Sequence, residues 1–156
     1  MEHIWIYTLS KELSKEQLTE FKAMCQSFVE DWKAHEVSLV ASYELYQDRI
    51  LIFKVDESNY EASGCSLDSK TRFVKHLEQK FDIELLNRLL VGYIDEANKL
   101  HIVKHTQIPE LLANQTIHPN TLVLNNSITF ASELESNWKV PLSSTWLSKF
   151  LVAKSA

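Results

Sequence analysis

The residues of this sequence best suited to chemistry lie in one polar segment, residues 61–69 (E-A-S-G-C-S-L-D-S). Gly64 can adopt a positive φ or let a ligand approach the backbone closely. Cys65 is expected at or just before the start of a helix, where free N–H groups and the helix dipole stabilise a thiolate or a bound anion. The segment therefore suggests a nucleophilic or redox-sensing thiol, or an anion pocket.

Three further polar residues, Ser63, Ser66 and Asp68, complete this candidate site. The candidate ligand-binding residues are Ser63, Gly64, Cys65 and Ser66, and the candidate catalytic residues are Cys65 and Asp68. An alternative interpretation is a capped helix start, with Ser66 or Asp68 as the N-cap and Cys65 as a small buried hydrophobe. No base that could activate the thiol is visible in the sequence, so both interpretations stay open.

A weaker set of candidates comes from the expected fold, which would bring the loop after the first strand to the same end of the sheet. Ser10, Lys11 and Asp56 would then join the segment 61–69.

The six histidines and the paired carboxylates favour surface positions over a metal or acid–base site. His101 and His105 would share a strand face and His118 follows, but neither cysteine is near and no H-E-x-x-H motif occurs, so we expect no metal. The carboxylate pairs Asp95/Glu96 and Glu133/Glu135 stand in polar segments. No G-x-S-x-G motif is present.

Composition excludes several classes of function. The chain has 156 residues, a net charge of −5 and only two glycines, so it contains neither a P-loop nor a dinucleotide-binding G-x-G-x-x-G motif. The acidic balance argues against nucleic-acid binding. The densest basic run is interrupted by Glu78 and is predicted to be the solvated face of a helix: Lys70, Arg72, Lys75, His76 and Lys80.

The sequence shows no signal for export or membrane insertion. The first residues lack a basic region followed by an apolar stretch, and no apolar run approaches a span of about 20 residues. Two cysteines, Cys25 and Cys65, do not make a disulfide framework. We therefore expect a soluble cytoplasmic protein that binds no membrane.

Hydrophobic periodicity predicts a β-α-β-β-α-β order in residues 1–96. The expected strands are 3–8, 37–46, 49–56 and 89–95, and the expected helices are 15–34 and 66–81. Ser14 and Gln17 form a capping box, and Gln47-Asp48 is a hairpin turn. This order is typical of a ferredoxin-like α+β fold with both helices on one face of an antiparallel sheet.

The remaining residues, 97–156, are expected to extend this core within a single domain spanning 1–156. Strand 100–104 would form a hairpin with the preceding strand, Pro109 would open a short helix, and 121–124 would form a short strand. Ser143 or Ser144 would cap a last helix containing Trp146 and Phe150. With Trp138, these aromatic residues either pin that helix to the core or form a groove for a partner.

Four motifs in order resemble a family of small uncharacterised proteins of Bacteroidetes that often carry the label "ABC transporter ATPase". They are F-V-E-D-W-K-A-H (28–35), A-S-G-C-S-L-D-S (62–69), T-L-V-L-N-N (121–126) and W-K-V-P with a later S-x-W (138–146). The resemblance implies a bacterial protein but supplies no catalytic residues. The label does not fit, because two isolated glycines cannot form a Walker A loop.

These observations favour a non-enzymatic protein that binds a partner protein or a small anionic ligand and needs no cofactor. The alternatives are a thiol-dependent enzyme or redox sensor that uses Cys65, and an anion or nucleotide binder at the Gly64-Cys65 helix start. A homodimer is possible by analogy with other ferredoxin-like sheets.

Overall fold

A computed structural model describes residues 1–34, 37–57 and 64–152, without the side chains of Cys65 and Val152. The chain divides into two compact units. Unit 1 contains Met1–Asn87 together with Thr129–Ser132, and unit 2 contains Arg88–Ile128 and Glu133–Ala156. Among the described residues, no helix combines the length and the apolar character that a membrane span requires.

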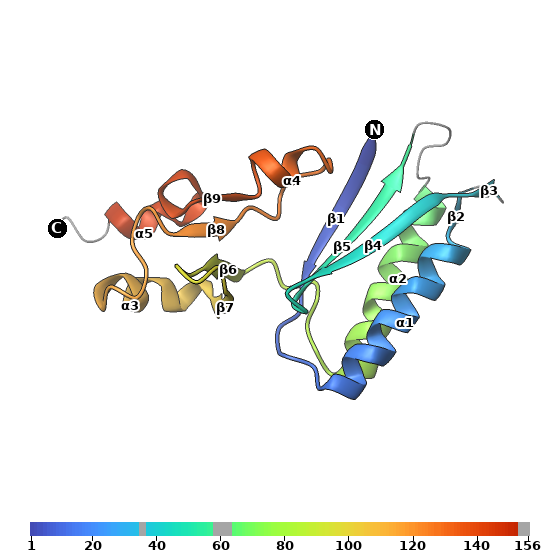
Figure 1. Cartoon of the computed structure of the whole chain (residues 1–156), viewed down its shortest axis with the longest axis horizontal. Helices are drawn as coiled ribbons and strands as arrows, with labels where there is room; N and C mark the ends of the chain where they lie inside the picture. Colours follow the sequence, from blue (N-terminus) through green and yellow to red (C-terminus); the bar gives the residue numbers. More distant parts are fainter. Residues whose placement is uncertain (35–36, 58–63, 153–156) are drawn as a thin grey trace. The chain divides into compact units, whose positions relative to one another are not determined.

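Unit 1 is built on a three-stranded antiparallel sheet of order β1-β5-β4 (Figure 1). Its strands are β1 (Glu2–Thr8), β4 (Val40–Tyr46) and β5 (Ile50–Asp56). Asp56 at the end of β5 lies opposite Glu2 of β1 and Val40 of β4. The predicted β4–β5 hairpin is confirmed, and its turn residues Gln47 and Asp48 have φ of 46° and 57°.

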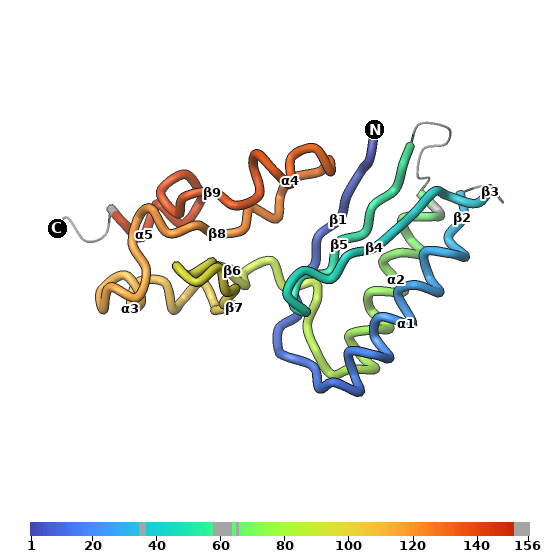
Figure 2. Tube along the Cα trace, viewed as in Figure 1, coloured from blue at the N-terminus to red at the C-terminus, as the bar shows by residue number. Residues whose placement is uncertain are grey.

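Two helices, α1 (Lys15–Asp31) and α2 (Gly64–Phe81), lie side by side on one face of this sheet (Figures 1 and 2). The predicted capping box at Ser14 and Gln17 is confirmed. Ring centroids of Phe28 and Phe73 stack at 4.3 Å between the helices. Helix α1 ends earlier than predicted, because Lys33–Ala34 forms β2, which pairs with β3 (Val37–Ser38). His35, which follows the predicted helix 15–34, lies outside the described residues.

A four-residue segment, Thr129–Ser132, returns from unit 2 to pair with β1, and we call it the strap. The Ile4 amide donates to the Thr129 carbonyl at 2.8 Å, and the Ala131 amide donates to the Glu2 carbonyl at 2.9 Å. His3 and Phe130 are opposite each other in this antiparallel bridge. The strap therefore occupies the edge of β1 that faces away from β5.

Unit 2 contains a four-stranded antiparallel sheet of order β7-β6-β8-β9. The strands are β6 (Leu90–Ile94), β7 (Leu100–Lys104), β8 (Leu122–Leu124) and β9 (Lys139–Pro141). The helices are α3 (Ile108–Ala113), α4 (Glu133–Ser136), α5 (Lys149–Val152) and the short 3-10 turns His105–Gln107, Leu142–Ser144 and Trp146–Ser148. Pro109 stands in the first turn of α3, as predicted.

The mixed α+β class with antiparallel sheets is confirmed, whereas the complete ferredoxin-like order is not. The strand predicted to be fourth in the first sheet, β6, pairs instead with β7 and β8. Both edges of β6 are therefore used within unit 2, and the free edge of β1 pairs with the strap. The predicted division at residue 96 falls inside the β6–β7 turn, whereas the units divide between Asn87 and Arg88.

The end of the chain also differs from the prediction. Thr145, and neither Ser143 nor Ser144, caps the turn that contains Trp146, because its hydroxyl accepts a hydrogen bond from the Leu147 amide at 3.2 Å. Ser143 and Ser144 belong to the preceding 3-10 turn. Trp138 is buried with 5% exposure, whereas Trp146 is 49% exposed.

Candidate functional site

A lysine is buried among aromatic rings where α2 packs on β1. Lys70 is 6% exposed, and its Nζ donates to the Tyr7 Oη at 2.6 Å. The same Nζ lies 4.8 Å from the centroid of the Trp5 ring and 5.3 Å from that of Tyr7. We call Trp5, Tyr7, Trp32, Ser66 and Lys70 the Lys70 cluster.

The spacing of residues along α2 explains why Lys70 is buried. Ser66, Lys70, Val74 and Leu77 recur at helical spacing and form one face, and all four are buried. The Ser66 carbonyl accepts a hydrogen bond from the Trp32 Nε1 at 2.9 Å. Trp32 follows α1 as its C-cap, so this bond joins the end of α1 to the start of α2.

Burying an ammonium group is expensive, since the effective penalty after relaxation is still several kcal/mol per ion. A hydrogen bond that involves a charged group offsets about 1.5–3 kcal/mol. A desolvated cation over an aromatic face offsets about 2 kcal/mol. The hydrogen bond to Tyr7 and the contacts with the two rings therefore offset part of the cost of burying Lys70.

A second aromatic layer connects this cluster to the strap. The His3 ring stacks on Trp5 with centroids 4.4 Å apart and planes inclined by 5°. On the strap, the Phe130 ring lies 5.5 Å from His3. The Nδ1 of His3 lies 3.7 Å from a Glu57 carboxylate oxygen.

The segment suggested by the sequence leads into the same part of the unit. Helix α2 begins at Gly64, two residues before the predicted start. Of the two suggestions for Gly64, the positive φ is excluded, since neither glycine has one. Gly64 is exposed, and a Cβ added to it would meet nothing within 4 Å. Ser63 and the side chain of Cys65 lie outside the described part of the chain.

The other two candidate residues, Ser66 and Asp68, point in different directions. Ser66 is 1% exposed and lies in the first turns of α2, so it is not the N-cap. Asp68 is also inside the helix, and it is exposed. The structure therefore places Ser66 beside Lys70 in the buried cluster and leaves Asp68 on the surface.

The weaker set, Ser10, Lys11 and Asp56, is not brought together. Because β1 and β5 are antiparallel, Asp56 lies opposite Glu2 and the loop after Thr8 lies at the other end of the sheet. At that end the Ser10 hydroxyl accepts from the Glu84 amide at 2.7 Å, and Lys11 pairs with Asp82 at 3.2 Å. The predicted proximity of Ser10 and Lys11 to the start of α2 is therefore wrong.

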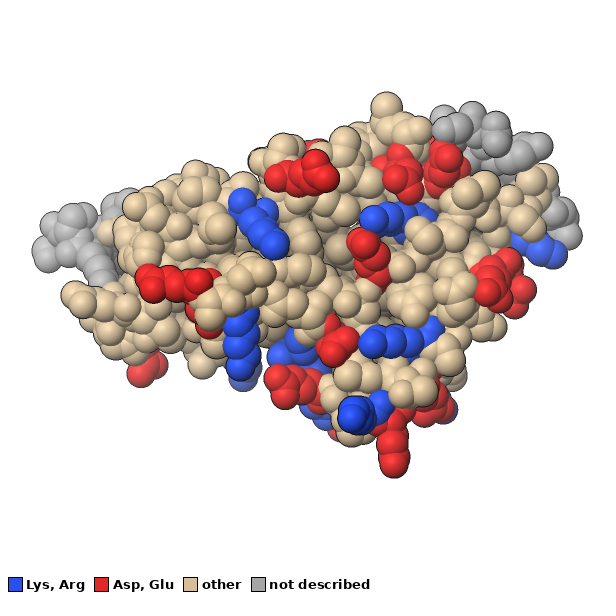
Figure 3. Space-filling model, viewed as in Figure 1, with Lys and Arg blue, Asp and Glu red and all other residues tan. Residues whose placement is uncertain are grey.

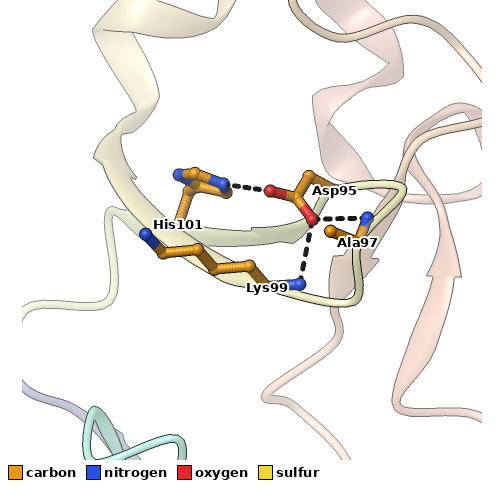
Figure 4. Close-up of polar contacts among 4 residues, drawn as sticks. All are labelled: Asp95, Ala97, Lys99 and His101. Carbon is orange, nitrogen blue, oxygen red and sulfur yellow. Dashed lines mark hydrogen bonds and ion pairs between the residues drawn. The ribbon is translucent and has the colours of Figure 1, made fainter.

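Unit 2 contains an acid–base pair in the β6–β7 hairpin (Figure 4). One Asp95 carboxylate oxygen lies 2.8 Å from the His101 Nε2, and the other accepts from the Ala97 and Lys99 amides at 2.8 and 2.9 Å. The hydrogen bond to His101, followed by that from Lys99, lowers the pKa of Asp95. A catalytic dyad also needs a nucleophile beside the imidazole. Within the described chain, His101 hydrogen-bonds to Asp95 alone, so this pair fastens the turn.

The remaining predicted sites have ordinary positions. Burial raises the pKa of Cys25 to about 12, so this thiol is not a reactive group. Residues 1–34, 37–57 and 64–152 contain no group of three or more His, Cys, Asp or Glu side chains that could hold a metal. On the face shown in Figure 3, basic and acidic side chains are interspersed and form no continuous basic stripe.

Sequence reasoning missed two features of these sites. Lys70 was grouped with a solvated basic face, and this is wrong for Lys70, although Arg72, Lys75, His76 and Lys80 are exposed. Its spacing of four from both Ser66 and Val74 was the signal that could have placed it inside. The pairing of Asp95 with His101 follows from the hairpin, whose register places Tyr93 opposite His101 just beyond the turn.

No family model, no curated protein and no solved structure matches the chain. The resemblance to the Bacteroidetes family therefore stays a prediction. A function can be inferred only from the side chains described above.

Proposed function

We propose that this chain is a binding protein for a small anionic ligand, which it holds at the Lys70 cluster. The observation that carries the proposal is the Lys70 ammonium, which is 6% exposed and lies over two aromatic rings on a buried helix face. Ligand sites combine mainly apolar and aromatic walls with a few polar groups that fix orientation, and this cluster has that composition.

Each part of the cluster has a defined contribution to binding. The Lys70 ammonium would supply the charge, and the Tyr7 hydroxyl at 2.6 Å would supply a second donor to the same anionic group. The Trp5 and Tyr7 rings would pack on the apolar part of the ligand. Lys70 lies in the second turn of α2, and lysine side chains on helices incline toward the N-terminus, where the positive end of the dipole favours an anion.

The test compares two lysines of the same helix. Thermal unfolding of the wild type, Lys70→Met and Lys75→Met is followed with inorganic phosphate, nucleoside phosphates and aromatic carboxylates. Lys75 is exposed, so its variant removes the same charge without changing the cluster. At least one anion class should raise the Tm of the wild type and of Lys75→Met, and it should leave that of Lys70→Met unchanged.

Titration calorimetry with that anion then measures the affinity. Tyr7→Phe removes one donor and should weaken binding about 3- to 10-fold, the equivalent of one hydrogen bond. The proposal fails if no anion class changes the Tm of the wild type, or if the shift persists in Lys70→Met. Far-UV circular dichroism establishes that each variant is folded.

A further inference from the structure

The strap covers only one end of the strand with which it pairs. β1 has seven residues, whereas the strap contributes a single bridge, between His3 and Phe130, and two backbone hydrogen bonds. Within the described ranges, the backbone hydrogen bond farthest along β1 joins Ile4 to Thr129, and the preceding residue, Ile128, belongs to unit 2. The edge of β1 is therefore longer than its occupant.

The alternation of the β1 backbone shows which of its N–H and C=O groups face this edge. Glu2 and Ile4 direct their backbone groups at the strap, and alternate residues of a strand face the same edge, so Ile6 faces that edge too. In the described ranges, no backbone group forms a hydrogen bond to Ile6 from that side. An extended segment that continued the strap's register would place residues 128 and 127 opposite Trp5 and Ile6.

The side chains at the bridge provide a basis for selectivity. His3 and Phe130 form the non-hydrogen-bonded type of antiparallel pair, in which side chains approach most closely. The His3 ring is backed by Trp5, so the residue opposite it meets a flat aromatic surface. Thr129 and Ser132 on either side are exposed. The edge thus recognises one aromatic side chain and a stretch of extended backbone.

We propose that the outer edge of β1 is a docking edge for an extended peptide segment with an aromatic residue opposite His3, and that the strap is its resident, displaceable occupant. Adding a strand to a sheet edge obtains affinity from main-chain hydrogen bonds and specificity from alternate side chains. A segment that pairs with all of β1 forms more of these bonds than the strap does. The strap pairs with β1 over a single bridge, and segments with short pairing open locally at lower free energy than core strands.

The test uses a fluorescein-labelled peptide that copies residues 126–133 (N-S-I-T-F-A-S-E). In the wild type the tethered strap competes at an effective concentration of about a millimolar, so the peptide should bind weakly. Phe130→Ala and Ala131→Pro each weaken the strap, by removing the ring or the donated N–H, and should bind the peptide at least 10-fold more tightly. Ser132→Ala, with an exposed side chain, should behave like the wild type, and a peptide with alanine in place of phenylalanine should bind at least 10-fold less tightly.

Amide hydrogen exchange identifies the docking position. The bound peptide should slow exchange at Ile6, which the strap does not cover, and at Ile4, while Val55 in the middle of the sheet serves as the internal reference. The proposal is overturned if neither Phe130→Ala nor Ala131→Pro binds the peptide more tightly than the wild type. It is also overturned if the bound peptide leaves Ile6 exchange unchanged, because the peptide then docks elsewhere.

Discussion

The two glycines of this chain stand in opposite surroundings. Gly64 opens α2, is exposed, and has no atom within 4 Å of the position of an added Cβ. Gly92 lies within β6, where an added Cβ would come 3.1 Å from side-chain carbons of both Leu100 and Leu124. The glycine beside the chemically attractive residues therefore has room for a side chain, and the one in an apolar strand is closely enclosed by two leucine side chains.

This comparison shows that the residue types next to a glycine do not indicate how closely that glycine is packed. A glycine next to Cys65 and two serines suggested a positive φ or ligand approach, and Gly64 has neither a positive φ nor a close protein neighbour. The close approach occurs in unit 2, at a position with no polar neighbour in the sequence. Lys70 follows the same pattern, because only its spacing of four from Ser66 and Val74 pointed to its burial, while the adjacent charged residues suggested an exposed face.

The largest expected effect is a difference in reactivity between the two thiols, Cys25 and Cys65. It tests whether Cys65, at the start of α2, is a reactive thiol. Cys25, with a pKa of about 12, should have a thiolate fraction at pH 8 on the order of a thousandfold below that of an ordinary thiol. Alkylation of the native chain, read by mass spectrometry from pH 6 to 10, should therefore label Cys65 and spare Cys25. An apparent pKa for Cys65 well below about 8.5 would support the thiol hypothesis.

The control for this experiment is alkylation in denaturant, where both cysteines should react at similar rates. Equal, slow labelling of both thiols in the native chain would contradict the hypothesis of a reactive Cys65. The start of α2 would then be a helix start without special chemistry.

An effect of intermediate size is expected on the free energy of unfolding when each glycine is replaced by alanine. Gly92→Ala should lower the free energy of unfolding by about 1–3 kcal/mol, because the new methyl forces two leucine side chains aside. Gly64→Ala should leave it unchanged or raise it by about 0.5 kcal/mol, since alanine restricts the unfolded chain and meets nothing in the folded one. Urea unfolding measures both, and a larger loss from Gly64→Ala than from Gly92→Ala would reverse the comparison.

The smallest effect is expected at the β6–β7 turn. The pKa of Asp95 is lowered in the folded chain, so its ionisation stabilises the fold above the unfolded value of about 3.9. That contribution is lost as the pH falls through the lower folded pKa. Asp95→Asn should therefore reduce the Tm at pH 7, and the difference from the wild type should shrink below pH 4.

Glu96→Gln is the matched control, because Glu96 is the exposed neighbouring carboxylate. It should change the Tm less than Asp95→Asn at pH 7. A difference between Asp95→Asn and the wild type that stays constant down to pH 2 would show that the carboxylate charge does not hold the turn.

Local features of unit 1 were predictable because they depend on neighbours in the sequence. The Ser14 capping box and the Gln47-Asp48 turn each involve residues no more than a few positions apart. The β6–β7 hairpin was predictable for the same reason. Pairing between distant segments has no such local signal, so the placement of β6 and the existence of the strap were missed.

The sequence by itself determined the mixed α+β class, the main helices and hairpins, and the absence of a phosphate-binding glycine loop, because periodicity, turn residues and composition are properties of the chain alone. Only the tertiary structure decided which edge each strand uses, which glycine is enclosed, and that the Lys70 ammonium lies between Trp5 and Tyr7. These outcomes depend on contacts between residues up to about 130 positions apart, such as the bridge of His3 with Phe130. The free energy that stabilises these contacts comes from burial of apolar surface and from backbone pairing between segments. Both exist only once the chain has folded.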